Sequence, residues 1–247
     1  CLPRGAQLVS QDCEKTIVVM CNGRSLKDVD FSLLEGIDTF GMNMAFRYYS
    51  ENNWYPTYFA SFDYNTNDRN AKSFVDLMSG NNTIERFFFI RDFSKFGKFS
   101  RFTHVKLHDK EVGWNKDEQA FGHFHSFWNT GTNVCSTAVC MGYNNIILLG
   151  ADNTQKEFYN GVVSAGGNQR VMESTPDHNP CYWMDDYFRE GDVFNAPNKD
   201  IYHTPWWPKF AKMARKNGVR VVNCSEISLL DCFEKSTLLK ELERLKR

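Results

Sequence analysis

The sequence predicts an α/β fold, in which one domain holds a mainly parallel sheet with helices on both faces and an aromatic-rich lid. Short apolar runs alternate with helical segments along most of the chain, which is the pattern of parallel strands joined by crossover helices. This pattern is lost between residues 152 and 203, where aromatic residues are frequent. The 247 residues suffice for one core, and no clear linker divides them.

Each predicted strand is a short apolar run that suits burial on both faces of a parallel sheet. The first run reads Ile-Val-Val-Met and is followed by a polar turn. In chain order, the predicted strands are 17–20, 39–42, 58–62, 86–90, 104–107, 146–149 and 219–222.

Helices are expected between several of these strands. The pattern predicts a short turn at 32–35 and longer helices at 70–78, 132–141 and 208–216. The last of them ends at Asn217-Gly218, because glycine takes the left-handed conformation without steric cost.

The C-terminal segment 233–247 has the pattern of an amphipathic helix. Leu238, Leu239, Leu242 and Leu245 fall in one stripe, and basic residues lie toward the end that the helix dipole favours. Two alternatives stay open for this helix. It packs on the domain, or it contacts an anionic membrane surface as a basic amphipathic anchor.

Residues 152–203 contain many aromatic side chains but no sustained periodicity. A loop of this length inside a compact domain is usually functional, so we expect a lid subdomain inserted in a single catalytic domain that spans residues 1–247. Its aromatic side chains would form a wall over the strand ends. An irregular packed insertion is the alternative.

Composition narrows the class of protein. A formal net charge of -1 argues against nucleic acid as a partner, because phosphate-backbone affinity needs a clustered basic excess. No stretch approaches the roughly 20 apolar residues of a membrane span, and the N-terminus lacks a signal-peptide pattern. We therefore expect a cytoplasmic protein, with peripheral contact at a membrane surface and a homo-oligomer both left open.

The eight cysteines are expected as free thiols, because several fall in apolar elements.

The turn after the first predicted strand, Asn-Gly-Arg-Ser, predicts one half of a nucleotide site. Ligands gather where the carboxyl ends of parallel strands meet. Asn22 and Ser25 are short polar side chains suited to ribose or phosphate, and Gly23 lets the backbone approach a ligand closely. Arg24 would pair with a phosphate or lie exposed.

A second segment, residues 130–152, predicts the other half. Thr130, Gly131 and Thr132 open a helix of small residues, where N–H groups and the helix dipole favour an anion. The following strand ends in Gly-Ala-Asp, which adds Asp152 to the expected binding residues. Plain capping of a helix by threonine is the alternative.

These segments resemble bacterial sialyltransferases of glycosyltransferase family 42 over most of the chain. The resemblance rests on residues 22–27, on the strand that ends in Asn43, on residues 130–152, and on a late His203 before a helix and the strand 219–222. It implies a modified Rossmann fold of GT-A-like type with a lid. It also implies a CMP-sialic acid donor, a glycan acceptor, inversion at the anomeric carbon and no essential metal.

The resemblance also assigns roles. Asn43 is similar to the family asparagine that contacts the nucleotide, and the helix start at Thr130 corresponds to the place that receives the donor sugar and its carboxylate. His203 is the expected general base, since an imidazole can take the proton of the attacking hydroxyl. The phosphate donors come from the residues of the lid and not from the resemblance: Tyr159, Tyr182 and Tyr187 are candidates to donate hydrogen bonds to the leaving phosphate, and Tyr159 and Tyr187 are the expected pair.

Other chemistry stays open. Asp63 and Asp152 each follow a predicted strand, where carboxylates often hold a magnesium-bound diphosphate. The same segments also resemble, more distantly, the archaeal 6-hydroxymethylpterin pyrophosphokinase-like family, which would make the chain a magnesium-dependent phosphotransferase. A metal-dependent transferase that uses another nucleotide sugar, and a carbohydrate-binding module without turnover, are the further alternatives.

Overall fold

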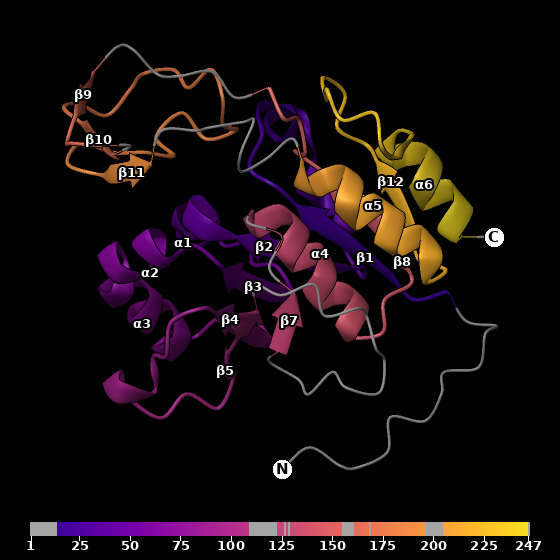
Figure 1. Ribbon diagram of the computed structural model, residues 1–247, viewed down its shortest axis with the longest axis horizontal. Coiled ribbons are helices and arrows are strands. Elements are labelled where there is room, and N and C mark those ends of the chain that lie inside the picture. Colours follow the sequence, from indigo (N-terminus) through magenta and orange to yellow (C-terminus); the bar gives the residue numbers. More distant parts are fainter. Residues whose placement is uncertain are drawn as a thin grey trace.

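A parallel sheet forms the centre of the computed structural model (Figure 1). Its eight described strands are ordered β13-β12-β8-β1-β2-β3-β4-β5, and every adjacent pair is parallel. The predicted α/β class is therefore confirmed. The structure describes residues 14–108, 123–125, 127, 129–154, 161–167, 169–195 and 205–246.

The strands of this sheet coincide with the predicted apolar runs to within about two residues at most ends. The exception is the run 104–107, which divides between β5 and a short strand, β6 (Lys106–His108), that pairs with β7 (His123–His125). The two-residue β13 was not predicted, because it is too short to show a pattern. The strands of the sheet are β1 Thr16–Met20, β2 Asp38–Met42, β3 Tyr58–Ser61, β4 Arg86–Phe89, β5 Phe102–His104, β8 Asn145–Leu149, β12 Arg220–Asn223 and β13 Glu234–Lys235.

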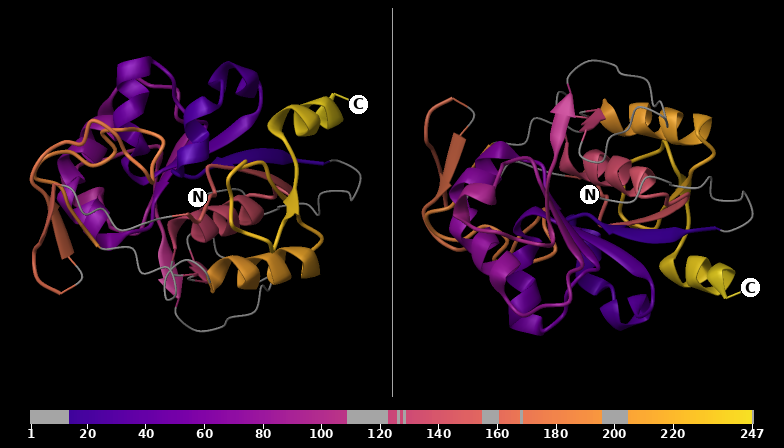
Figure 2. Two further views of the ribbon diagram at one scale, coloured as in Figure 1. Left: turned by 90° about the horizontal axis from the view of Figure 1, so that it is seen from above. Right: turned by 90° about the horizontal axis from the view of Figure 1, so that it is seen from below.

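Helices cover both faces of the sheet (Figure 2). Successive residues of a strand point to opposite faces. Ile17 and Val19 of β1 accordingly lie in one core, and Val18 and Met20 lie in the other. The first core is closed by α4 (Thr130–Cys140) and α5 (Trp206–Lys216), and the second by α1 (Phe46–Asn52), α3 (Ala71–Ser79) and α6 (Leu238–Leu245).

The predicted helices are found, and α1 and α2 (Tyr64–Arg69) are added to them. Both are too short to show a helical period in the sequence. Asp63 follows β3 and is the N-cap of α2, because its carboxylate accepts the N–H of Thr66 at 2.6 Å. The described residues also contain four 3-10 helices: η1 Arg24–Asp28, η2 Phe31–Leu34, η3 Asn43–Ala45 and η4 Ser94–Phe96.

The C-terminal helix α6 packs on the domain, which is the first of its two alternatives. Leu242 is buried, and Leu238 and Leu245 lie half-buried against the second core. Only Leu239 of the predicted stripe is exposed. In the part of the chain that the structure describes, no helix is long and apolar enough to cross a membrane.

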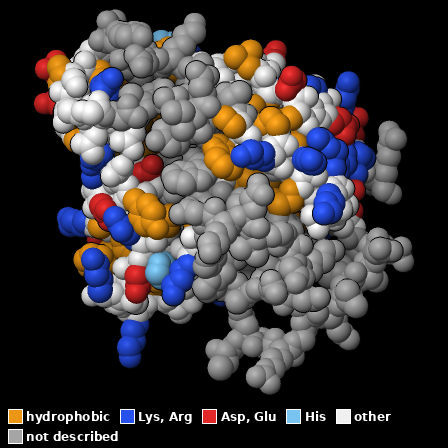
Figure 3. All heavy atoms as spheres, viewed as in Figure 1, with side chains coloured by type: hydrophobic (Ala, Val, Ile, Leu, Met, Phe, Trp, Pro, Cys, Tyr) orange, Lys and Arg blue, Asp and Glu red, His pale blue; other side chains and the backbone are white. Residues whose placement is uncertain are grey.

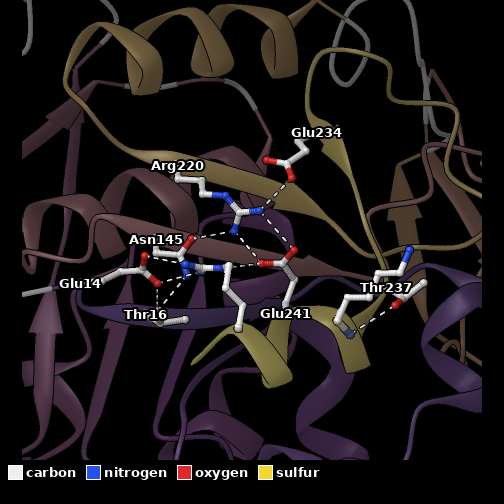
Figure 4. Close-up of polar contacts among 9 residues, drawn as sticks. Glu14, Thr16, Asn145, Arg220, Glu234, Thr237 and Glu241 are labelled. Atoms are coloured by element: carbon white, nitrogen blue, oxygen red, sulfur yellow. Dashed lines mark hydrogen bonds and ion pairs between the residues drawn. The ribbon is translucent and has the colours of Figure 1, made fainter. Parts of the chain in front are cut away.

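A network of ion pairs fastens α6 to the amino ends of the strands (Figure 4). Arg220, at the start of β12, lies 2.6 Å from Glu241 of α6 and 2.9 Å from Glu234. Arg244 of α6 adds pairs at 3.2 Å to Glu241 and 2.7 Å to Glu14. Glu241 is only 4% exposed, and the hydrogen bonds from Arg220 lower its pKa to about 2.

The described part of the lid divides in two. Its outer part is a small antiparallel sheet of β9 (Val162–Ser164), β10 (Gln169–Met172) and β11 (Val193–Asn195). The segment between β10 and β11 instead enters the second core through Trp183, Met184 and Tyr187. We call residues 179–188 the lid base. The boundaries 152–203 stay a prediction.

Candidate active site at the carboxyl edge of the sheet

A cavity of about 910 Å³ lies at the carboxyl edge of the sheet. β1 ends there between β2 and β8. The strands β2 to β5 follow on one side of β1 within the sheet, and β8, β12 and β13 follow on its other side. Such a topological switch point is where open parallel sheets bind ligands. The cavity wall is formed by the turns after β1, β2, β3 and β8, by the first turn of α4, by α2, by Trp207 of α5 and by lid residues between 181 and 195.

The two glycine segments of the sequence touch each other at this edge. The N–H of Gly23 donates to the carbonyl of Gly150 at 2.8 Å. A Cβ atom on Gly23 would collide with that carbonyl and would lie 2.6 Å from Oδ2 of Asp152. Gly23 is therefore needed for the close packing of the two segments. This packing explains why residue 23 is a glycine, without the close approach of a ligand that the sequence predicts.

Asp152 organises the turn after β1. Its carboxylate, 2% exposed, accepts the Ser25 N–H at 2.8 Å and the Ser25 hydroxyl. Ser25 does not line the cavity, because its hydroxyl is turned to this partner. Arg24 also lies outside the cavity wall, 3.5 Å from Asp185 of the lid base. Burial raises the pKa of the neighbouring Cys21 thiol to about 12, and the negative charge of Asp152 contributes to a smaller extent.

Asn22 links the first strand to the lid base. Its Nδ2 donates to the carbonyl of Met42 at 3.1 Å and to the hydroxyl of Tyr187 at 3.0 Å. Its Oδ1 accepts the indole N–H of Trp183 at 3.4 Å. Both amide hydrogens of Asn22 are thus donated within the protein. One of them goes to the hydroxyl of Tyr187, so Asn22 helps to orient that side chain.

Tyr187 presents a neutral hydroxyl to the cavity. Its ring is buried and stacks on Tyr182 with centroids 4.1 Å apart. Burial holds its pKa well above the ordinary value. The oxygen accepts a hydrogen bond from Asn22, and the described residues provide no acceptor for its proton. The hydroxyl is therefore placed to donate to a ligand.

Two asparagines at the cavity wall have left-handed backbones. Asn43 has a φ of 52° and Asn153 a φ of 54°. Residues held in such conformations cost on the order of 1 kcal/mol or more and cluster at functional sites. Oδ1 of Asn43 accepts the hydroxyl of Ser61 at 3.0 Å, which turns its NH₂ group away from Ser61. Asn43 thus lies where the sequence predicts a nucleotide contact.

The N-terminus of α4 brings a residue that the sequence analysis did not single out. Asn129 caps this helix, since its Oδ1 accepts the N–H of Thr132 at 2.8 Å. That bond fixes which end of the amide is Nδ2. Asn129 is 7% exposed and lines the cavity, and its Nδ2 has no hydrogen-bond partner in the described structure. An asparagine directly before a predicted helix was the signal that could have found it.

The three predicted residues of this helix start have different positions. Thr130 and Gly131 line the cavity, whereas Thr132 is fully buried and its hydroxyl donates to the carbonyl of Asn129 at 3.2 Å. A Cβ atom on Gly131 would lie 2.8 Å from the ring of Trp207. Gly131 therefore lets α4 and α5 approach each other beside the cavity.

Two of the predicted catalytic residues, His203 and Tyr159, lie outside the described residues. Their roles stay predictions. Among the histidines whose side chains the structure describes, none lines the cavity. His178, another histidine of the lid, is exposed and lies 3.6 Å from Asp185, outside the cavity wall.

The magnesium alternative lacks a matching set of ligands in the described part of the chain. Asp63 and Asp152 both line the cavity, but Asp63 caps α2 and Asp152 is engaged by Ser25. Asp192, the other carboxylate there, forms a bidentate pair with Arg47 at 2.6 and 3.0 Å. Mg²⁺ requires near-octahedral oxygen ligands. The described residues contain no group of three potential metal ligands that could hold it.

Comparisons with known proteins give structural neighbours only. No family model and no curated protein matches the chain. Sialyltransferase CstII from Campylobacter jejuni, solved with cytidine-5'-monophosphate, is 14% identical with a TM-score of 0.47, over 89% of this chain and 84% of that one. An alpha-2,3-sialyltransferase from Campylobacter jejuni is 14% identical with a TM-score of 0.46, over 93% and 82%.

The MAf glycosyltransferase from Magnetospirillum magneticum AMB-1 has a TM-score of 0.50 at 12% identity. The match covers 94% of this chain but 36% of that larger one. At such identity the likeness concerns the fold and leaves the reaction open. Together with the eight-stranded parallel sheet, it shows that this chain has a Rossmann-like fold.

Proposed function

We propose that this chain is an inverting, sialyltransferase-like glycosyltransferase, which moves sialic acid or a related keto-acid sugar from CMP to a glycan acceptor. The observation that carries the proposal is a cavity whose wall includes Tyr187 and Asn129, two residues that have a donor hydrogen without an acceptor in the described structure. A CMP-activated keto-acid sugar has two anionic groups, a phosphate and a carboxylate. Helix N-termini and neutral N–H or O–H donors suit both.

In this proposal the acceptor hydroxyl attacks the anomeric carbon from one face. The bond from that carbon to the phosphate oxygen breaks on the opposite face, and its electron pair leaves with CMP. Tyr187 donates to the phosphate as its charge grows. His203 takes the proton of the hydroxyl, and no metal ion is needed.

The remaining contacts follow from position. The helix start at Asn129 and Thr130 would hold the sugar carboxylate, and Asn43 would contact the nucleotide. Asn22 would be a positioning residue, because its amide hydrogens serve Met42 and Tyr187.

A thermal-shift screen with CMP, UDP and GDP tests the nucleotide. A ligand present at one hundred times its Kd stabilises the folded protein by about 2.7 kcal/mol, and CMP should give the largest shift. Asn129→Ser keeps a capping oxygen but removes the free donor. It should therefore weaken the additional shift produced by CMP-sialic acid more than it changes the melting temperature of the free protein. A shift with UDP or GDP and none with CMP would overturn the proposal.

Hydrolysis of CMP-sialic acid tests the chemistry. We expect turnover to survive a chelator and to be lost in His203→Ala. His178→Ala, in the same lid but outside the cavity wall, is the matched control and should retain turnover. Abolition by the chelator would point to the magnesium-dependent phosphotransferase instead.

A further inference from the structure

Helix α5 carries a stripe of lysines on the face that points away from the core. Its inner face is buried through Trp207 and Phe210. Lys209, Lys212 and Lys216 lie on the opposite face and are exposed. α5 contains four basic residues and no acidic one, whereas the whole chain has a net charge of -1.

Contacts within the described structure explain this stripe only in part. Within the described residues, none of the three lysines forms an ion pair. Like charges three or four residues apart on a helix repel each other, and a cation near the helix N-terminus opposes the dipole. Lys216 suits the C-terminal end, Arg215 donates to the carbonyl of Cys232 at 3.0 Å, and the ammonium of Lys209 lies over the ring of Trp206, 4.0 Å from its centroid. Lys212 has no such contact within the described residues.

Exposed apolar side chains lie on a loop that packs against the same helix. The loop between β12 and β13 packs against α5, where the rings of Trp207 and Phe233 are 5.8 Å apart. The same loop exposes 47% of Ile227 and 67% of Leu229. Its backbone is held in place, since the N–H of Leu229 donates to the carbonyl of Asp152 at 2.8 Å. Figure 3 shows basic and hydrophobic side chains next to each other over this part of the molecule.

We propose that the lysine stripe of α5, with Ile227 and Leu229, is a docking surface for an anionic lipid bilayer. The lysines would meet lipid phosphates, and the two aliphatic side chains would enter the interface. Charge complementarity selects an anionic partner, and the exposed aliphatic side chains favour a bilayer over a water-soluble polyanion. The inference does not depend on the reaction, although Trp207 places the same helix at the cavity wall.

Flotation with lipid vesicles tests the surface. We compare phosphatidylcholine vesicles with vesicles that contain about 30% phosphatidylserine, at salt concentrations of about 0.1 and 1 M. The protein should bind only the anionic vesicles and should be released by salt. Each lysine near such a surface strengthens binding about fivefold, so the triple variant K209E/K212E/K216E should bind at least about a hundredfold more weakly.

The matched control is K72E/K95E/K98E, which makes the same change of charge at three exposed lysines elsewhere. It should bind far better than the α5 variant. I227S/L229S should weaken vesicle binding and leave binding to heparin, a soluble polyanion, unchanged. The proposal is wrong if the protein ignores anionic vesicles, if both triple variants lose binding equally, or if it binds heparin but no vesicle. The melting temperature of each variant and its CMP-dependent shift report folding and the cavity separately.

Discussion

The two edges of the central sheet are built from different chemistry. At the amino edge, full charges are matched to each other: Arg220 and Arg244 share Glu241, and each has a second carboxylate. At the carboxyl edge, the cavity wall includes amides, hydroxyls and three carboxylates that already have partners within the protein, and the Nδ2 of Asn129 is left without a partner in the described structure.

This difference separates stability from binding. In a buried ion pair that is complete within the protein, both charges already have partners, so neither is available to bind a ligand. A buried donor without a partner lowers the stability of the free protein by about 1–3 kcal/mol, and a ligand that accepts its hydrogen bond recovers that loss. We therefore expect substitutions at the amino edge to change the free energy of unfolding, and those at the carboxyl edge to change turnover.

The largest effect is expected from Tyr187→Phe. The ring keeps its stacking on Tyr182, but the proposed donor to the leaving phosphate is lost. We expect kcat for CMP-sialic acid hydrolysis to fall about 10² to 10³-fold. Tyr143→Phe, whose hydroxyl bonds Asp38 at the amino edge, is the control and should change stability while kcat is kept. Equal rates in Tyr187→Phe and the unmodified protein would remove Tyr187 from the mechanism.

Arg220→Ala should cause the largest loss of stability. It leaves the buried Glu241 carboxylate with one ion pair in the described structure, the 3.2 Å contact to Arg244. We expect the free energy of unfolding in urea to drop by about 3 kcal/mol. Arg91→Ala breaks a pair with Asp68 in which both side chains are about half exposed, and should cost less than about 1 kcal/mol. Similar losses in the two variants would contradict the contrast between the edges.

Acid should weaken the amino edge through Glu241. Its pKa in the folded protein is about 2, against an ordinary value of 4.5, so the stability it contributes is present above pH 4.5 and is lost as the pH falls toward 2. Between about pH 5 and pH 3 this amounts to about 2 kcal/mol. Urea unfolding across that range should show a flatter dependence in Glu241→Gln. Glu243→Gln, an exposed change on the same helix, should leave the slope as it was.

The smallest effect is expected at the contact between the glycine segments. Gly23→Ala pushes a methyl group against Gly150 and Asp152, and should cost about 2 kcal/mol of stability together with part of the CMP-dependent thermal shift. Gly36→Ala meets open space at a φ of +78°, so only backbone strain of about 1 kcal/mol is expected, with no change in the CMP shift. The reverse order would show that crowding at Gly23 is relieved by a small shift.

The sheet could be predicted from the sequence because each of its longer strands is buried on both faces. Such a strand is a run of apolar residues, and β1 and β8 show this without interruption. The antiparallel strands of the lid could not be predicted in the same way. β9 and β11 are largely exposed or half-buried, so their sequences carry no alternation of apolar and polar residues.

The sequence indicates at which end of the strands the candidate site lies, but it does not indicate which residues contact each other there. Asn22 and Gly23 follow β1 as expected, yet their partners are Tyr187 and Gly150, far away in the sequence. No local pattern encodes such pairs. The Ser25 to Asp152 contact is of the same kind, since each residue alone suggests a ligand contact and together they satisfy one another.

The lid base belongs to the same hydrophobic core as the sheet that it helps to enclose, through Trp183, Met184 and Tyr187. A cover attached only by hinges can be exchanged between related proteins as a module. Here, exchanging residues 179–188 would also exchange part of the core, so selection for a new ligand at Tyr187 is constrained by selection for folding. The site and the domain are therefore inherited together.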